Sequence, residues 1–116
     1  MLVARAHPRN PGIGDTGRMA TLLDDHAVQT WLADHPDWQR DGAEIRRSVT
    51  CETFPAAIDL VGRVAEVAER RDHHPDIDVR WRTLHFALST HSAGGLTAND
   101  LSLAEEIDRL AGSASA

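Results

Sequence analysis

Paired cysteines, long apolar runs and a secretory leader are all missing from this sequence. Cys51 is the single cysteine in 116 residues, so no internal disulfide can form. No apolar run approaches the ~20 residues that a membrane-spanning helix needs, so we expect no membrane partner. The N-terminal residues lack the charged-then-apolar plan of a secretory signal peptide, and we therefore expect a cytoplasmic protein.

An excess of positive charge is missing as well. The chain has 12 Lys and Arg residues against 18 Asp and Glu residues, which gives a formal net charge of -6. Such a charge disfavours non-specific attraction to phosphate backbones, so nucleic acid is not an expected partner. The hydrophobic content of 41% and the charged content of 26% are ordinary for a globular protein, and the length fits one domain.

Composition divides the chain into one domain and two short tails. Residues 1–19 are rich in proline and glycine and poor in apolar side chains, so they cannot bury enough surface to offset the entropy of ordering. We expect a disordered tail there, a folded domain over 20–112 and a disordered Ser/Ala tail at 113–116.

The first half of the domain predicts a helix followed by a hairpin. Residues 25–34 carry apolar side chains at helical spacing, and Asp24 or Asp25 can cap them, because a short carboxylate accepts bonds from the free amides of a first turn. His35-Pro36 ends this helix, since the residue before proline is pushed out of the helical conformation. Residues 38–51 then read as a hairpin around an Asp-Gly pair, which adopts the positive backbone angles of a tight turn.

The longest helix is predicted from about residue 54 to residue 71. Thr53 can cap it, and Pro55 falls in the first turn, where a missing amide proton costs little. Apolar residues recur in it at spacings of three and four, which predicts one buried face made of Phe54, Ile58, Val61, Ala65 and Ala68.

A second hairpin and a third helix follow. Apolar and polar residues alternate in two stretches within 78–89, as a half-buried sheet requires, and the first stretch places Val79 and Trp81 on one face. Thr97 and Asp100 form a variant of the capping box, in which each side chain can bond the other's backbone amide. A third helix is therefore predicted to begin after Thr97 and to end near Gly112.

The predicted order is helix, two strands, helix, two strands, helix. Hairpins with interleaved helices are typical of an α+β domain with two layers. We expect a four-stranded antiparallel sheet with three helices packed on one face.

Three of the seven histidines lie near this second hairpin: His73 and His74 before it, and His91 after it. Antiparallel pairing would bring them close together, and three histidines could supply ligands for zinc. The spacing argues against a metal, however. Adjacent histidines usually point apart, no His-x-x-x-His pair falls on a helix, and Cys51 is far away in sequence, so we expect no metal site.

Acid–base catalysis is the second interpretation of these histidines. Imidazole titrates near neutrality, so one histidine can remove a proton while another protonates a leaving group. The alternative is that they cap loops and strand ends through backbone hydrogen bonds. Spacing alone favours neither interpretation.

A longer pattern resolves the choice, because it extends over most of the domain. From about Leu22 to Leu110 the chain resembles the pterin-4a-carbinolamine dehydratases, also called 4a-hydroxytetrahydrobiopterin dehydratases. The residues that carry the resemblance are Glu69, Asp72-His73-His74-Pro75, Trp81, His85, Ser89-Thr90-His91, Gly95-Leu96-Thr97 and Asp100.

The resemblance implies an enzyme that dehydrates a 4a-hydroxytetrahydropterin to the quinonoid dihydropterin, with no metal or organic cofactor. This reaction recycles the tetrahydropterin cofactor of aromatic amino acid hydroxylases. The expected partners are a reduced pterin substrate and further copies of the chain, as a homodimer or homotetramer built by sheet extension and helix packing.

The resemblance also implies roles for single residues. His73 and His91 would be the acid–base pair, and His74 would hold and orient the pterin in the catalytic site. Asp100 would cap and support the site rather than transfer protons. The substrate-binding residues would be Glu69, His74, Pro75, Trp81, Ser89, Thr90 and Asp100.

Two observations leave alternatives open. Ile77 stands where many animal members of the family carry a tryptophan, which changes the pocket wall, because an indole packs differently from a branched aliphatic side chain. Animal members also act as dimerisation cofactors for a homeodomain transcription factor. The alternative function is therefore a non-catalytic pterin-binding or protein-interaction module.

Overall fold

The computed structural model describes residues 21–114, so the predicted tail at 1–19 lies outside the described residues. The element order is the predicted one, with a short 3-10 helix added before the last helix. The elements are α1 (Asp25–Asp34), β2 (Gln39–Asp41), β3 (Glu44–Thr50), α2 (Phe54–Arg71), β4 (Asp76–Arg80), β5 (Thr83–Leu88), η1 (His91–Ala93) and α3 (Ala98–Ala114). The last helix extends past Gly112, into the stretch predicted to be a tail.

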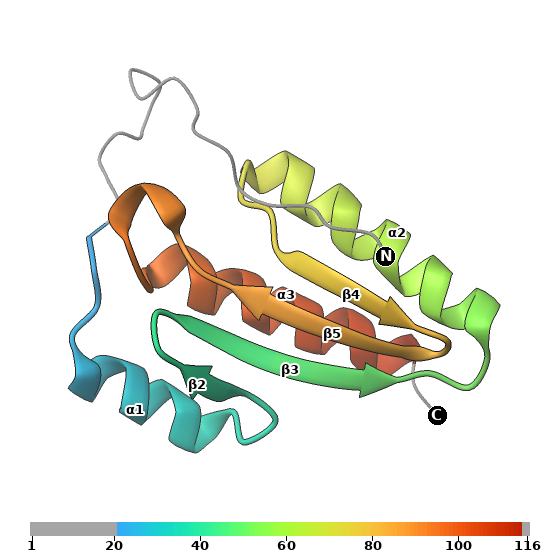
Figure 1. Ribbon diagram of the computed structural model, residues 1–116, viewed down its shortest axis with the longest axis horizontal. Helices are drawn as coiled ribbons and strands as arrows, with labels where there is room; N and C mark the ends of the chain where they lie inside the picture. The colour runs from blue at the N-terminus through green and yellow to red at the C-terminus, as the bar shows by residue number, and fades with distance from the viewer. Residues whose placement is uncertain (1–20, 115–116) are drawn as a thin grey trace.

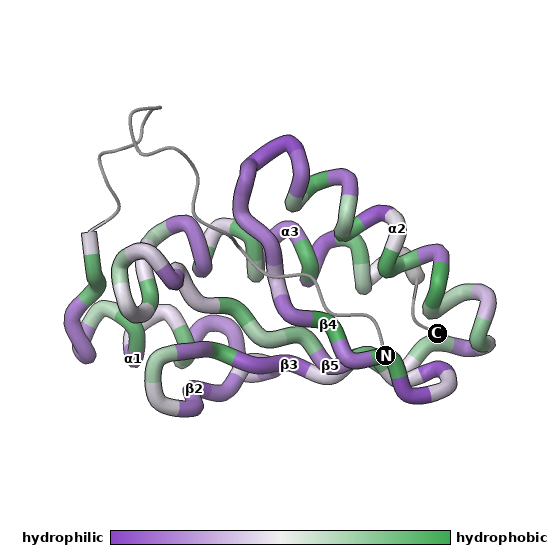
Figure 2. Tube along the Cα trace, turned by 45° about the horizontal axis from the view of Figure 1, so that its top comes forward, coloured by the Kyte–Doolittle hydropathy of each residue, from purple (hydrophilic) through white to green (hydrophobic). Residues whose placement is uncertain are grey.

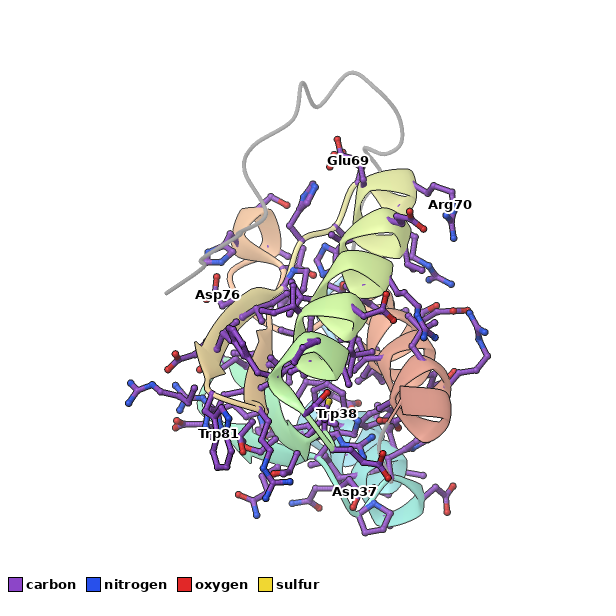
Figure 3. The ribbon with its side chains drawn as sticks, turned by 90° about the vertical axis from the view of Figure 1, so that its right-hand side faces the viewer. Asp37, Trp38, Glu69, Arg70, Asp76 and Trp81 are labelled. Carbon is purple, nitrogen blue, oxygen red and sulfur yellow. The ribbon has the colours of Figure 1, made fainter. Side chains whose placement is uncertain are left out.

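The strands form one antiparallel sheet in the order β2-β3-β5-β4, which confirms the predicted α+β class. Figure 1 shows α2 and α3 side by side behind the sheet, and the view from the side in Figure 3 places all three helices on that face. No element of residues 21–114 covers the other face of the sheet. Within the described part of the chain, no helix combines the length and the apolar character that crossing a membrane requires.

The core lies between the sheet and the helices. Alternate residues of the two central strands point into it, as the period of two predicts, and meet apolar residues from α2 and α3. The buried side chains include Ile45 and Val49 from β3, Leu84, Phe86 and Leu88 from β5, Leu60 and Val64 from α2, and Leu103 and Ile107 from α3. Val28 adds α1 to the same cluster.

Helix α2 begins as predicted, with the Thr53 hydroxyl accepting from the Ala56 amide at 3.1 Å. The predicted buried face was wrong for three of its members. Phe54 and Ile58 are 46% and 45% exposed, and Ala65 is exposed too. Apolar residues lie on two faces of this helix, and the sheet covers the face that has more of them. The buried residues are Ala57, Leu60, Val61, Val64, Val67 and Ala68. Figure 2 shows the hydrophobic and hydrophilic stretches alternating along α2.

The position predicted for Trp81, on the same strand face as Val79, was also wrong. Arg80 pairs with Thr83, so the strands close through a tight turn made of Trp81 and Arg82. Trp81 has a φ of 54° there and is 70% exposed, so it does not share the inner face with Val79. A tight turn places a positive φ at such a position, and this requirement overrides the preference of tryptophan for strands.

Candidate functional site

The C-terminal end of α2, the start of β4, the end of β5 and the first turn of α3 meet at one end of the molecule (Figure 1). His73 is fixed there by the way α2 ends. Asp72 adopts the left-handed conformation with a φ of 54°, its amide bonds the carbonyls of Ala68 and Glu69, and the His73 amide bonds the Ala68 carbonyl at 3.0 Å. This is the Schellman arrangement, and aspartate is one of the few residues other than glycine that accept its left-handed position.

The His73 ring lies against a buried carboxylate. Its Nε2 is 2.6 Å from Oδ1 of Asp100, in the first turn of α3. His73 is 6% exposed and Asp100 is 0% exposed, so water does not compete for this contact. The pair therefore has the geometry in which a carboxylate orients an imidazole.

The second oxygen of Asp100 is also occupied. Oδ2 accepts from the Thr90 hydroxyl at 2.7 Å and from the Thr97 amide at 2.9 Å. Of the two hydrogen bonds of the predicted capping box, the structure has the one in which the Thr97 amide donates to the Asp100 side chain. The Thr97 hydroxyl accepts from the Asn99 amide at 3.2 Å rather than from the amide of Asp100.

His74 faces a different partner. Its Nε2 is 2.8 Å from Oε1 of Glu69, on the last turn of α2. The Glu69 side chain is 82% exposed and the His74 side chain is 16% exposed, so this second histidine–carboxylate pair lies at the surface beside the buried one.

His91 opens the short helix η1 and is exposed. Its neighbour Thr90 bonds Asp100, which in turn contacts His73, so the fold brings the two ends of the hairpin together. The loop after His91 is held closed by a bridge between Thr90 and Gly95, whose backbone groups bond at 2.8 Å and 3.3 Å.

The remaining predicted site residues lie either near the histidines or far from them. Pro75 is buried immediately after the histidine pair, and Ser89 is half-buried at the end of β5. Trp81 lies elsewhere: Figure 3 shows Glu69 and Trp81 at opposite ends of the molecule. The length of β4 puts Trp81 roughly 16 Å from the start of the strand, at ~3.3 Å per residue. Within one chain, Trp81 therefore does not line a pocket around His73.

Sequence reasoning missed the connection between Thr90 and Thr97. Their hydroxyl oxygens are 2.8 Å apart, and both residues are buried. The capping pattern marked Thr97 as a helix cap, but only the fold shows that the same residue contacts a strand end. The signal in the sequence was a threonine on each side of the Gly94-Gly95 loop.

Among residues 21–114, the other polar groups with shifted pKa values do not form a second site of this kind. The open face of the sheet has a hollow of about 1000 Å³, lined among others by Arg46, Arg80 and His85. The hydrogen bond to Glu44 raises the pKa of Arg46, and the bond to Asp78 raises that of Arg80, so both cations are paired. Burial raises the pKa of the Cys51 thiol, which disfavours the thiolate that a nucleophile needs.

Metal ligands do not gather in this part of the protein. Over residues 21–114, the structure has no group of three or more His, Cys, Asp or Glu side chains that could hold a metal ion. The titratable groups of the site instead occur as two imidazole–carboxylate pairs, His73 with Asp100 and His74 with Glu69. Such pairs suit the binding and transfer of protons.

Known proteins share this fold and sequence. The structure of a transcriptional coactivator/pterin dehydratase from Brucella melitensis has a TM-score of 0.76 at 28% identity, covering 79% of this chain and 100% of that one. A pterin dehydratase-like protein described as a RuBisCO assembly factor in the alpha-carboxysome has a TM-score of 0.54 at 18% identity and shares the fold alone.

Two relatives found by sequence have a higher identity to this chain than these two structures. A protein of Nocardia farcinica with the name "Putative pterin-4-alpha-carbinolamine dehydratase" is 64% identical over 90 residues, which cover 78% of this chain and 95% of that protein. A protein of Mycobacterium tuberculosis with the same name is 53% identical over 91 residues, which cover 78% of this chain and 97% of that protein. The family model described as pterin 4 alpha carbinolamine dehydratase matches residues 21–110, and the chain therefore belongs to this family.

Proposed function

We propose that the protein dehydrates a 4a-hydroxytetrahydropterin to the quinonoid dihydropterin, and so recycles the tetrahydropterin cofactor of aromatic amino acid hydroxylases. The observation that carries this proposal is the buried pair of His73 and Asp100, 2.6 Å apart, at the end of the sheet that also holds His74 and His91. Family membership supplies the substrate class, and the pair supplies a proton-transfer group held in place.

The reaction needs two proton transfers and no nucleophile. The N5 proton leaves the pterin ring, the hydroxyl on C4a is protonated and departs as water, and a double bond forms between N5 and C4a. His73 and His91 divide these transfers, one as base and the other as acid. Each histidine returns to its starting state by exchanging a proton with water, so the atoms and charges balance over the cycle.

The other groups hold the pterin and the histidines. His74, supported by Glu69 at 2.8 Å, is the proposed contact with the ring, with Pro75 and Ser89 beside it. Asp100 and Thr90 are buried and bonded to each other, so we assign them to the support of His73 rather than to substrate contact. Trp81 is left out because of its position at the far hairpin turn.

The test is dehydration of freshly generated 4a-hydroxytetrahydropterin, followed by the absorbance of the quinonoid product. The parent protein should accelerate the reaction, and His73→Ala and His91→Ala should each lower turnover by roughly 10²–10⁴, the range of a lost general acid or base. His26→Ala is the matched control, because His26 is exposed on α1 and has no proposed role in the reaction. Parent-like activity in both site variants, or no acceleration by a folded parent, would contradict the proposal.

A second proposal concerns self-association. Phe54 and Ile58 are one helical turn apart on α2 and are each nearly half exposed, so they begin an apolar stripe that the sheet does not cover. Solvent-exposed apolar stripes of this kind mark interaction surfaces. We propose that this stripe packs against another copy of the chain in a homodimer or homotetramer.

A further inference from the structure

Asp100 makes three hydrogen-bond contacts, and the direction of each bears on the protonation of its neighbours. The Thr97 amide and the Thr90 hydroxyl both bond Oδ2, at 2.9 Å and 2.7 Å, and His73 Nε2 lies 2.6 Å from Oδ1. Asp100 is 0% exposed, so these protein groups alone solvate it. Its place in the first turn of the 17-residue helix α3 also stabilises a negative charge.

The threonine hydroxyls form a chain with a fixed direction. A hydroxyl has one proton to donate, and Thr90 donates it to Asp100. In the 2.8 Å contact between the hydroxyls of Thr90 and Thr97, the donor is therefore Thr97. The Thr97 oxygen accepts from the Asn99 amide, so the chain runs from Asn99 through Thr97 and Thr90 to Asp100.

The two donors on Oδ2 favour the ionised form of Asp100, and this charge determines the tautomer of His73. An ionised carboxylate only accepts hydrogen bonds, so the hydrogen in the contact with Asp100 must be on Nε2 of His73. In a neutral imidazole with a proton on Nε2, the lone pair is on Nδ1. The alternative is a protonated Asp100 that donates to Nε2, and in a neutral imidazole this would leave the proton on Nδ1.

We propose that Thr97 and Thr90 are positioning residues that hold His73 as the Nε2–H tautomer, and that Nδ1 of His73 is the atom that exchanges a proton with the pterin. This inference rests on the proposed dehydratase for its substrate but not for its tautomer. Neither threonine touches the reacting atoms, because each is buried behind Asp100. Their effect reaches the site through the orientation and charge of that carboxylate.

The tautomer is measured without substrate. Protein labelled with ¹⁵N-histidine is studied by long-range proton–nitrogen correlation at pH ~8, where an ordinary imidazole is neutral. His73 is assigned as the ring whose signals disappear in His73→Ala. A protonated Nε2 and an unprotonated Nδ1 are expected in the parent protein. The opposite tautomer, or an even mixture, would overturn the inference.

Variants then separate positioning from packing. Thr97→Val keeps the volume and removes the hydroxyl, whereas Thr97→Ser keeps the donor. The valine variant should show mixed His73 tautomers and a kcat lower by about 10-fold with KM unchanged, the size of one lost hydrogen bond near a charge. The serine variant should restore both. A valine variant with the parent tautomer and the parent kcat would contradict the role of Thr97.

The two proposals fail in different ways. A parent protein with the Nε2–H tautomer but no dehydratase activity would uphold the positioning network and overturn the function. A parent protein with activity but an Nδ1–H tautomer at His73 would overturn the positioning network and leave the function in place. Unfolding curves of Thr97→Val and Thr97→Ser identify any loss of activity that comes from misfolding.

Discussion

At the scale of single residues, His73 and His91 have the same proposed type of role in opposite environments. His73 is buried and bonded to a carboxylate that no water reaches, whereas His91 is exposed at the start of η1. Removing the His73 ring would leave Oδ1 of Asp100 without its imidazole partner, inside the protein. Removing the His91 ring exposes no such group.

The two alanine variants should therefore differ in stability although both lose activity. We expect His73→Ala to lower the free energy of unfolding by about 1–3 kcal/mol, the cost of a buried acceptor that loses its partner. His91→Ala should change it by less than about 0.5 kcal/mol, as exposed substitutions do. Urea unfolding followed by tryptophan fluorescence measures both. Equal stability of the two variants would mean that the contact with Asp100 contributes little.

At the scale of elements, periodicity predicted which segments are helices and strands but not which face of α2 is buried. Phe54 and Ile58 follow the same spacing as Leu60 and Val64, so hydropathy alone gives two equivalent stripes. Only the position of the sheet decides between them. Trp81 illustrates a similar limit, because the register of β4 and β5 places it in a turn that alternation had assigned to a strand.

The elements that carry the site were more predictable. Thr53 and the Thr97–Asp100 pair mark helix starts through short-range hydrogen bonds, which the sequence specifies directly. The contact between Thr90 and Thr97 crosses from a strand end to a helix start, and no local pattern encodes it. The sequence thus singled out the histidines of the candidate site but not the side-chain network behind them.

Helices α2 and α3 are joined by a charged contact that should depend on pH. Glu106 on α3 accepts from Arg109 at 2.6 Å and lies 3.5 Å from Arg71 at the end of α2. The hydrogen bond from Arg109, together with the charges of Arg109, Arg71 and Arg70, lowers the pKa of the Glu106 carboxyl. A lowered pKa in the folded state contributes stability above the unfolded value of ~4.3. That contribution is lost as pH falls through the folded value.

Glu106→Gln should therefore destabilise the protein at pH 7 and not at low pH. The expected loss is ~0.5 kcal/mol at pH 7, because the contact is partly exposed and screened by water and salt. It should vanish at a pH below the lowered pKa of Glu106, where the parent carboxyl is itself protonated. Urea unfolding at the two pH values measures the difference. A loss of the same size at both would assign the effect to packing rather than to charge.

At the scale of the whole molecule, one sheet face is covered by helices, and the chain folds back so that residues 69–75 meet residues 89–100 at one end. This arrangement explains why an α+β domain could be predicted from the order of its elements, whereas its surfaces could not. The described part of the chain leaves two surfaces uncovered, the open sheet face and the outer stripe of α2. The stripe is apolar and the sheet face is charged, so the two surfaces suit different contacts.

The apolar stripe of α2, with Phe54 and Ile58, predicts self-association of the protein. If it packs against another copy, the protein should sediment as a dimer or tetramer, and Phe54→Glu or Ile58→Glu should shift it toward the monomer, because a carboxylate in an apolar interface loses its water. Both side chains are nearly half exposed in the single chain, so the monomer fold should persist in circular dichroism. Gln29→Glu adds the same charge at an exposed position of α1 and should leave the assembly unchanged. A parent protein that stays monomeric at all concentrations, or glutamate variants that still assemble, would show that this stripe is no interface between copies.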